Sequence, residues 1–136
     1  MHQEQSYLLD IAKFCQAILR LTANMTEAEF QHDERTQFAI LYEITVLGEV
    51  VKRLSTEFRI QHPTIEWRRI AGMRDRLVHD YNEVKLDLVW EVVKTNIPEL
   101  LEYITRFYPA RTRLQIQTNI KKCSAMLTSV VPYRPR

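Results

Sequence analysis

The chain has 136 residues, 46% of them hydrophobic, with two glycines, five prolines and two cysteines. This length fits one domain with a sizeable core, and two glycines are too few for a turn-rich β-sandwich or a glycine-rich phosphate loop. The net charge of +2 hides an uneven distribution. Residues 1–107 hold 13 Lys and Arg against 17 Asp and Glu, whereas residues 108–136 hold six Lys and Arg and no acid. A basic tail on an acidic body indicates an anionic partner or a solvated extension.

Helical periodicity dominates residues 1–107. Apolar residues recur at i, i+3 or i+4 and i+7 over about 5–24, which predicts a first amphipathic helix. Thr26 and Glu29 form a capping-box pattern that predicts a short helical turn, and Asp33 is placed to cap a longer second helix. Gly48 inside that helix indicates a close helix contact, since glycine costs about 1 kcal/mol there relative to alanine. One side of the second helix is expected to carry Phe38, Leu41, Tyr42, Thr45, Val46, Glu49 and Val50.

Two further helical segments follow the His62-Pro63 dipeptide, because a residue before proline avoids the helical conformation. Thr64 is the expected cap of a third helix that runs on to about Tyr81. A fourth segment begins at Lys85 or Asp87 and reaches about residue 107, with Pro98 inside it as a kink or a new first turn. The apolar side of the third helix carries Ile65, Trp67, Ile70, Met73 and Leu77.

The predicted fold class is all-α, a four- to five-helix up-down bundle over residues 1–107 with no convincing strand. Residues 108–136 have no decisive period, so a further helix, a partner-binding segment and a disordered extension all stay open. Cys15 and Cys123 show no metal-ligand spacing, and no apolar run is long enough for a membrane span. We therefore expect a cytoplasmic protein with reduced thiols and no membrane partner.

Charged and titratable residues gather in the segment Arg74-Asp75-Arg76-Leu77-Val78-His79-Asp80-Tyr81. On a regular helix Asp75 and His79 share one face as i,i+4 neighbours. Arg74 and His79 are five residues apart and diverge by about 140°. They can meet at one substrate only through long side chains, a loosened last turn or two subunits. Taken alone, the pattern is equally typical of a solvated face with a histidine near a helix C-terminus.

The spacing Arg74-x4-His79-x-Tyr81 resembles the R-x4-H-x-Y signature of the HepT toxins of the HEPN superfamily, and the resemblance covers about residues 5–107. Asp75 stands where the HepT pattern often has Asn, and Asn82 where an aromatic residue is common. Other matching segments, in order, are Tyr7-Leu8-Leu9-Asp10-Ile11, Glu29-Phe30, Leu47-Gly48-Glu49, His62-Pro63, Ile65-Glu66-Trp67, Ile70-Ala71-Gly72-Met73-Arg74, Leu77-Val78-His79-Asp80-Tyr81, Val89-Trp90 and Ile97-Pro98-Glu99-Leu100.

This resemblance implies a homodimeric, metal-independent endoribonuclease without a cofactor, the toxin of a type VII (HEPN/MNT) toxin–antitoxin module. Its substrate would be messenger or transfer RNA. Its partner would be a cognate MNT-domain nucleotidyltransferase antitoxin, which silences related toxins by transferring AMP to the motif tyrosine, here Tyr81. Toxin and antitoxin can also assemble into a larger hetero-oligomer.

The resemblance also implies roles for individual residues. Arg74 and His79 are the catalytic pair: the arginine holds the phosphate, and the histidine transfers protons near neutral pH. Asp75 supports either of them, and Tyr81 contacts RNA. Two alternatives stay open, a non-catalytic HEPN module that binds nucleotides or the antitoxin, and a structural dimerisation domain.

Several residues have a structural role as good as a functional one. Arg69 and Arg76 are candidate RNA-binding residues, with Arg68 beside them, although Arg76 is equally placed to pair with Asp80 at i,i+4. The histidines outside the motif make no metal set. Trp67 and Trp90 are expected in the core or at a dimer interface rather than as stacking platforms for bases.

Overall fold

A computed structural model describes residues 2–79, 83–108, 110–111, 113–118 and 121. The described part is an all-α bundle, as predicted, apart from one two-stranded hairpin. The elements are α1 His2–Leu21, α2 Glu27–His32, α3 Glu34–Arg53, α4 Thr56–Gln61, α5 Trp67–Ala71, α6 Met73–Leu77, β1 Val78–His79, β2 Glu83–Val84, α7 Leu86–Glu91, the π-helical segment η1 Val92–Asn96 and α8 Ile97–Thr105.

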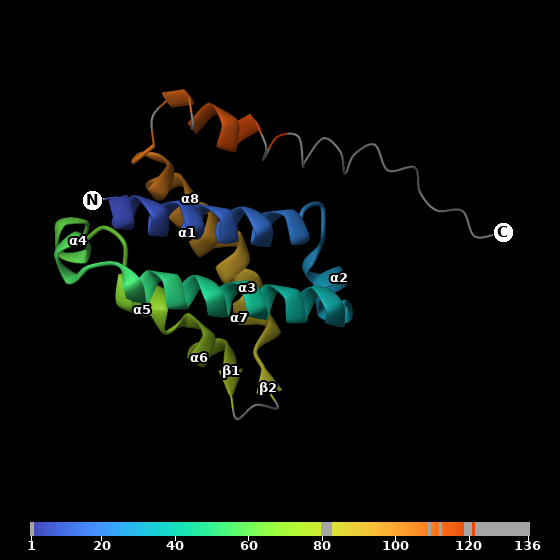
Figure 1. Cartoon of the computed structure of the whole chain (residues 1–136). Coiled ribbons are helices and arrows are strands. Elements are labelled where there is room, and N and C mark those ends of the chain that lie inside the picture. The colour runs from blue at the N-terminus through green and yellow to red at the C-terminus, as the bar shows by residue number, and fades with distance from the viewer. Residues whose placement is uncertain (1, 80–82, 109, 112, 119–120, 122–136) are drawn as a thin grey trace.

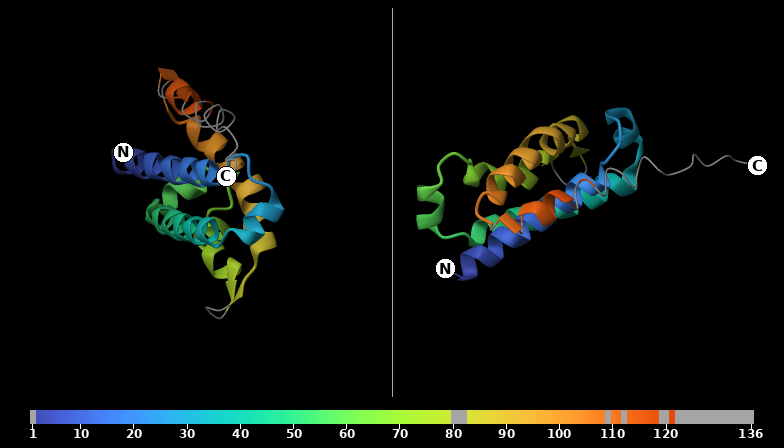
Figure 2. Two further views of the ribbon diagram at one scale, coloured as in Figure 1. Left: turned by 90° about the vertical axis from the view of Figure 1, so that its right-hand side faces the viewer. Right: turned by 90° about the horizontal axis from the view of Figure 1, so that it is seen from above.

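The two long helices α1 and α3 lie side by side and antiparallel (Figures 1 and 2). Helix α8 packs against α1, while α5 and α6 pack against α3. The apolar sides of these helices meet in one core. Its largest fully buried side chains are Phe30, Ile11, Ile18, Ile40, Ile44, Leu47, Leu54, Ile97, Leu100, Ile104, Val51 and Val89.

The predicted helix starts at Thr26 and Asp33 are confirmed. The Thr26 hydroxyl accepts a hydrogen bond from the Glu29 amide at 3.2 Å, and the Asp33 carboxylate accepts one from the Thr36 amide at 3.0 Å. The Thr36 hydrogen bonds also lower the pKa of the Asp33 carboxyl, because they favour its charged form. Helix α1 ends at Leu21, earlier than predicted, and the chain turns with Asn24 at a left-handed φ of 58°.

The buried side of α3 differs from the prediction. Phe38 and Tyr42, which we expected on the marked side, are 62% and 65% exposed, whereas Ile40, Ile44 and Leu47 lie in the core. Both sides of this helix carry apolar residues, so periodicity alone could not choose between them. Packing against α1 made the choice and left the two aromatic rings on the surface.

The prediction of one continuous third helix is wrong. The chain breaks at Gly72 into α5 and α6, and Thr64 caps neither of them, because α5 begins after Glu66 without a side-chain cap. Helix α6 ends at Leu77, whose carbonyl accepts a hydrogen bond from the Lys85 amide at 2.9 Å. Residues 78–79 and 83–84 pair as antiparallel strands. Pairing with the following segment therefore replaces the last helical turn.

The fourth segment follows the prediction. Helix α7 begins after Lys85, and Pro98 lies in the first turn of α8, directly after the π-helical segment η1. Beyond α8, residues 113–118 are helical and Ile116 is buried. Nothing among the described helices is both long and apolar enough to cross a membrane.

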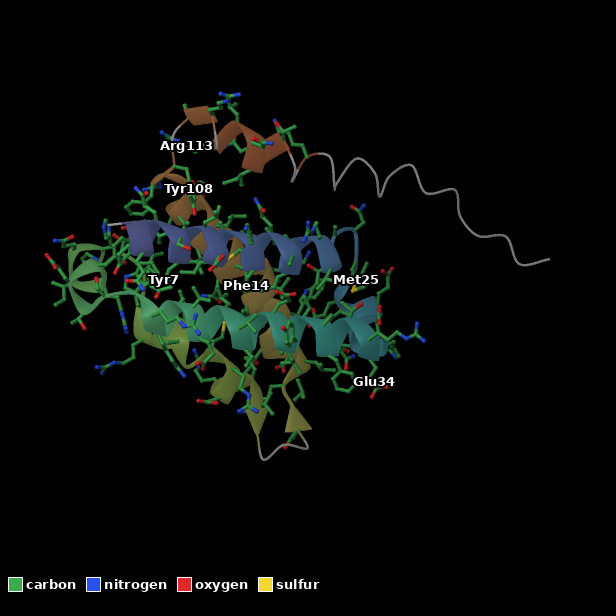
Figure 3. The ribbon with its side chains drawn as sticks, in the orientation of Figure 1. Tyr7, Phe14, Met25, Glu34, Tyr108 and Arg113 are labelled. Carbon is green, nitrogen blue, oxygen red and sulfur yellow. The ribbon has the colours of Figure 1, made fainter. Side chains whose placement is uncertain are left out.

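The chain that follows α8 passes beside the first half of α1. Tyr108 and Arg113 stand above that helix in Figure 3. Burial, and to a lesser degree the charge of Asp10, raise the pKa of the Tyr108 hydroxyl. Cys15 of α1 is fully buried, and burial raises the pKa of its thiol, so it belongs to the core. Cys123 lies outside the described residues.

Gly48 allows the closest approach between α3 and the segment that precedes the motif. A Cβ atom at this position would lie 3.0 Å from the carbonyl oxygen of Ala71. The neighbouring atom is backbone, so it cannot rotate away as a side chain would. The close contact expected from Gly48 is thus confirmed. It fixes α3 against Ala71 at the end of α5, three residues before Arg74 in the sequence.

Replacing Gly48 by valine should lower the free energy of unfolding by about 2 kcal/mol, because the branched side chain overpacks against the Ala71 carbonyl. Gly48→Ala is the matched control. Its clash is smaller, and alanine gains about 1 kcal/mol of helix propensity over glycine, so its stability should stay close to that of wild type. Urea denaturation followed by circular dichroism measures both variants. A valine variant as stable as wild type would show that α3 is not confined at this point.

Candidate active site

Helix α6 presents Arg74 at the surface. Its Met73 and Leu77 side chains are buried at 3% and 2% exposure, which anchors the helix and leaves the residues between them at the surface. Arg74 Nη1 donates to Asp75 Oδ1 at 3.2 Å, with the two side chains 43% and 77% exposed. An exposed pair of this kind adds at most about 1 kcal/mol of stability, so a bound anion can replace it.

His79 lies on β1, not on a helix. Its backbone pairs with Glu83 across the hairpin, one residue beyond the Val78–Val84 pair. The predicted i,i+4 relation of Asp75 to His79 on one helix face is therefore wrong. The divergence calculated for a regular helix likewise does not apply, because Arg74 is helical and His79 extended.

Asp80 and Tyr81 lie outside the described residues, as does the side chain of His79. The expected pairing of Arg76 with Asp80 and the role of Tyr81 are therefore untested predictions. What is described is a short helix that ends directly before a hairpin, with Arg74 on the helix and His79 at the hairpin's base.

Arg69 and Arg76 lie together at one hollow of about 50 Å³ between α6 and α7, which also contains Glu91 and Asn96. Arg69 in addition pairs with Glu66 at 3.2 Å. Arg74 is two residues before Arg76, a rotation of about 200° on a helix. Arg74 thus projects from the opposite flank of α6.

The two tryptophans are packed against other residues. Trp67 is 4% exposed, and its indole nitrogen donates to the His62 carbonyl at 2.8 Å. The ring of Trp90 lies 5.3 Å from that of Phe30, centroid to centroid, and packs against the core. The core interpretation of both tryptophans is therefore confirmed.

Two features near α4 were not predicted from the sequence, because this short helix was not predicted. His62 packs edge-on against Phe107, with ring centroids 4.7 Å apart, and its Nδ1 lies 3.1 Å from the Tyr103 hydroxyl. Arg59 directs its guanidinium to the carbonyl oxygens of Leu54 and Lys52. Two local signals were present, the proline after His62 and Ser55, whose hydroxyl caps α4 by accepting a hydrogen bond from the Phe58 amide at 3.1 Å.

The bundle with its helix–hairpin motif defines a class, the all-α domain of HEPN type. The family model described as "Ribonuclease HepT-like" matches residues 11–107. The chain belongs to this HepT-like ribonuclease family, as its motif residues indicated.

Curated relatives agree with this assignment. A "Probable ribonuclease HepT" of Thermococcus cleftensis is 38% identical over 96 residues, which cover 71% of this chain and 87% of the relative. A "Putative RNase" of Caldanaerobacter subterraneus is 34% identical over 74% of this chain and 89% of its own. Among solved structures there is no significant match.

Proposed function

We propose that this protein is an endoribonuclease that cleaves messenger or transfer RNA with Arg74 and His79 as its catalytic pair. The observation that carries the proposal is the exposed Arg74 on α6 directly before the hairpin strand that bears His79, in a chain of the HepT-like ribonuclease family. The Arg74 side chain is 43% exposed, and its one side-chain partner within the described part of the chain is the adjacent, mostly exposed Asp75, which supports contact with a large polyanion.

The chemistry uses a nucleophile that RNA itself carries. The 2′-oxygen bonds to phosphorus while the bond to the 5′-oxygen breaks, which leaves a 2′,3′-cyclic phosphate and a 5′-hydroxyl. A histidine can accept the 2′ proton or protonate the leaving oxygen near neutral pH. Arg74 stabilises the charge that develops on the phosphate oxygens. No step of this scheme requires a metal ion.

Asp75 supports this site as a positioning residue. Two roles were open from the sequence, orientation of His79 or of the arginine. The 3.2 Å contact from Arg74 to Asp75 favours the second role. Before RNA binds, the carboxylate holds the guanidinium at the surface of α6, and the phosphate then competes for it.

His79→Ala should lower the rate of RNA cleavage by at least about 100-fold, because proton transfer contributes that much or more. Arg74→Gln should lower it by about 100-fold through the lost phosphate contact. Cleavage of labelled RNA by purified, unmodified protein in the presence of EDTA measures both. Arg35→Gln, on the exposed first turn of α3, is the control. A His79→Ala variant that cleaves RNA as fast as wild type would refute the catalytic role of His79. It would favour the alternative of a non-catalytic binding module.

The proposed homodimer uses the face of α3 that carries Phe38 and Tyr42. On α3 the two rings lie opposite to the buried residues. Gly48, which faces α5, lies between these two sides of the helix. The aromatic pair therefore lies on the side of α3 that faces away from the core. A second copy on this face would cover two large exposed rings and bring two motifs together in one cleft, which an isolated chain does not provide.

Phe38→Ser combined with Tyr42→Ser should convert a dimer to a monomer and reduce cleavage, because both rings are surface residues in the single chain. Light scattering after size-exclusion chromatography gives the mass, and urea denaturation verifies the fold. Leu114→Ser, at a side chain that is 63% exposed, is the matched control. A double variant that stays dimeric would exclude this face.

The proposed regulation places the protein in a type VII toxin–antitoxin module with a nucleotidyltransferase antitoxin. Transfer of AMP to Tyr81 would add bulk and a phosphate charge next to the motif, and both would exclude RNA. The support is the match of Tyr81 to the motif tyrosine of a family that the chain belongs to. The basic residues of 108–136 would add RNA attraction or antitoxin contact.

Incubation with the cognate nucleotidyltransferase and ATP should add one AMP mass to wild type and none to Tyr81→Phe. Intact-mass spectrometry detects the adduct, and the adenylated protein should lose its cleavage activity. An adduct that persists in Tyr81→Phe would move the modification to another residue. No adduct on wild type would remove this form of regulation.

A further inference from the structure

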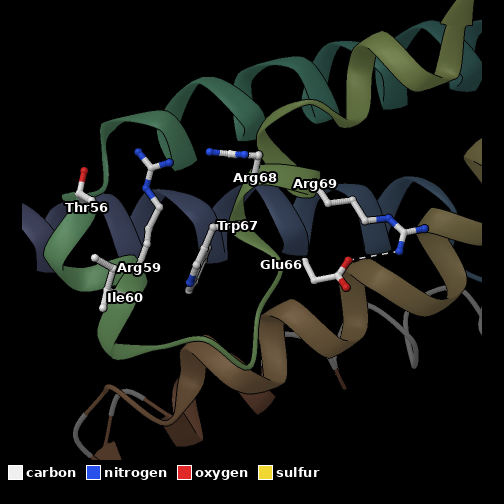
Figure 4. Close-up of a pocket in the computed structure, with 7 residues that line it drawn as sticks. All are labelled: Thr56, Arg59, Ile60, Glu66, Trp67, Arg68 and Arg69. Carbon is white, nitrogen blue, oxygen red and sulfur yellow. Dashed lines mark hydrogen bonds and ion pairs between the residues drawn. The ribbon is translucent and has the colours of Figure 1, made fainter.

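A broad hollow of about 680 Å³ opens between α4 and α5, outside the motif (Figure 4). Arg59 and Arg68 project into it from the two helices, and the ring of Trp67 lies between them. No part of the proposed catalytic scheme uses this surface. Its lining residues are Thr56, Arg59, Ile60, Glu66, Trp67, Arg68 and Arg69.

The hollow is basic although residues 1–107 are acidic as a whole. Three arginines line it against one glutamate, and that glutamate pairs with Arg69. Arg59 donates to the carbonyl oxygens of Leu54 and Lys52 at 3.0–3.2 Å. These neutral acceptors orient the guanidinium and leave its charge in place. The Arg68 side chain has no hydrogen-bond or ion-pair partner within the described part of the chain.

The hollow also has an apolar part. Ile60 is 72% exposed on one wall, an unusual position for a large aliphatic side chain, and Trp67, which is 4% exposed, adds a small part of its ring to the lining. The hydrogen bond from Trp67 to the His62 carbonyl holds that ring in place. Guanidinium groups beside apolar walls fit a phosphodiester together with its ribose or base, because each unit has an anionic and an apolar part.

The hollow continues toward the motif. Arg69 lines it and also two neighbouring hollows, of about 250 Å³ and 50 Å³, and the second of these contains Arg76. From Trp67 to Arg74 the chain advances seven residues through two short helices, a distance on the order of 10 Å if each helix rises regularly. A stacked single strand covers that distance in about three nucleotides.

We propose that this hollow binds the RNA substrate two or more nucleotides away from the scissile bond, through a phosphodiester held by Arg59 and Arg68. The proposal rests on the proposed ribonuclease function and deepens it. The site recognises the backbone of single-stranded RNA rather than a base sequence, because its charged groups are arginines that match phosphate geometry. Long substrates therefore bind better than short ones.

Two surface substitutions test the hollow without disturbing Arg59. Arg68→Gln removes a charge, and Thr56→Glu adds an opposing one at the first position of α4, where a helix tolerates an acid well. The control is Arg35→Gln, which removes the same charge in the first turn of α3. Glu34, the residue before it, lies at the end of α3 away from α4 and α5 in Figure 3.

Binding is measured by fluorescence anisotropy with a single-stranded, fully 2′-O-methylated RNA, which cannot be cleaved. The combined Arg68→Gln and Thr56→Glu variant should bind the RNA about 10-fold more weakly than wild type. The slope of log affinity against log salt concentration should also become less steep by about 0.7, as expected for one lost phosphate contact. Its KM should rise on a long RNA and stay unchanged on a trinucleotide, with kcat unaffected on both. Arg35→Gln should behave as wild type.

Equal losses in the combined variant and in Arg35→Gln would reduce the effect to net charge and overturn the proposal. A variant that binds RNA normally but loses the antitoxin would make the hollow a protein-binding site, which also overturns it. Failure of the wild-type protein to cleave any RNA would refute the proposed function instead. The anisotropy measurement would still show whether the hollow binds RNA.

Discussion

The close approach of α3 to the end of α5 is the contact on which the motif's position depends. A glycine at position 48 lets the Ala71 carbonyl come within 3.0 Å of where a Cβ would stand. Gly72 then interrupts the helix, and α6 begins at Met73 with its buried side anchored in the core. The orientation of Arg74 follows from this anchoring, because the buried Met73 and Leu77 determine which flank of α6 faces outward.

The end of α6 is where helix and hairpin compete for the same residues. The Leu77 carbonyl pairs with the Lys85 amide, and Val78 and His79 become a strand. The angle between Arg74 and a histidine on this strand is therefore not set by the rotation of about 100° per residue of a helix. The arginine and histidine of the motif thus belong to two different elements, which permits geometries that one regular helix excludes.

The arginines of α5 and α6 form a basic region on an otherwise acidic body. The body carries more acids than bases, and yet α5 and α6 contribute four arginines within nine residues, Arg68, Arg69, Arg74 and Arg76. Helical geometry sends Arg74 to one flank of α6 and Arg76 to the other. A polyanion that contacts both Arg74 and Arg76 therefore has to cross α6.

The all-α class, the caps at Thr26 and Asp33, the close contact at Gly48 and the new turn at Pro98 were readable in the sequence, because each depends on local hydrogen bonding or sterics. The family too followed from residues in order along the chain. Only the tertiary structure decided which side of α3 is buried, since both sides are apolar and α1 selects one. It also decided that α6 stops at Leu77, because the competing hydrogen bond comes from Lys85, eight residues further on.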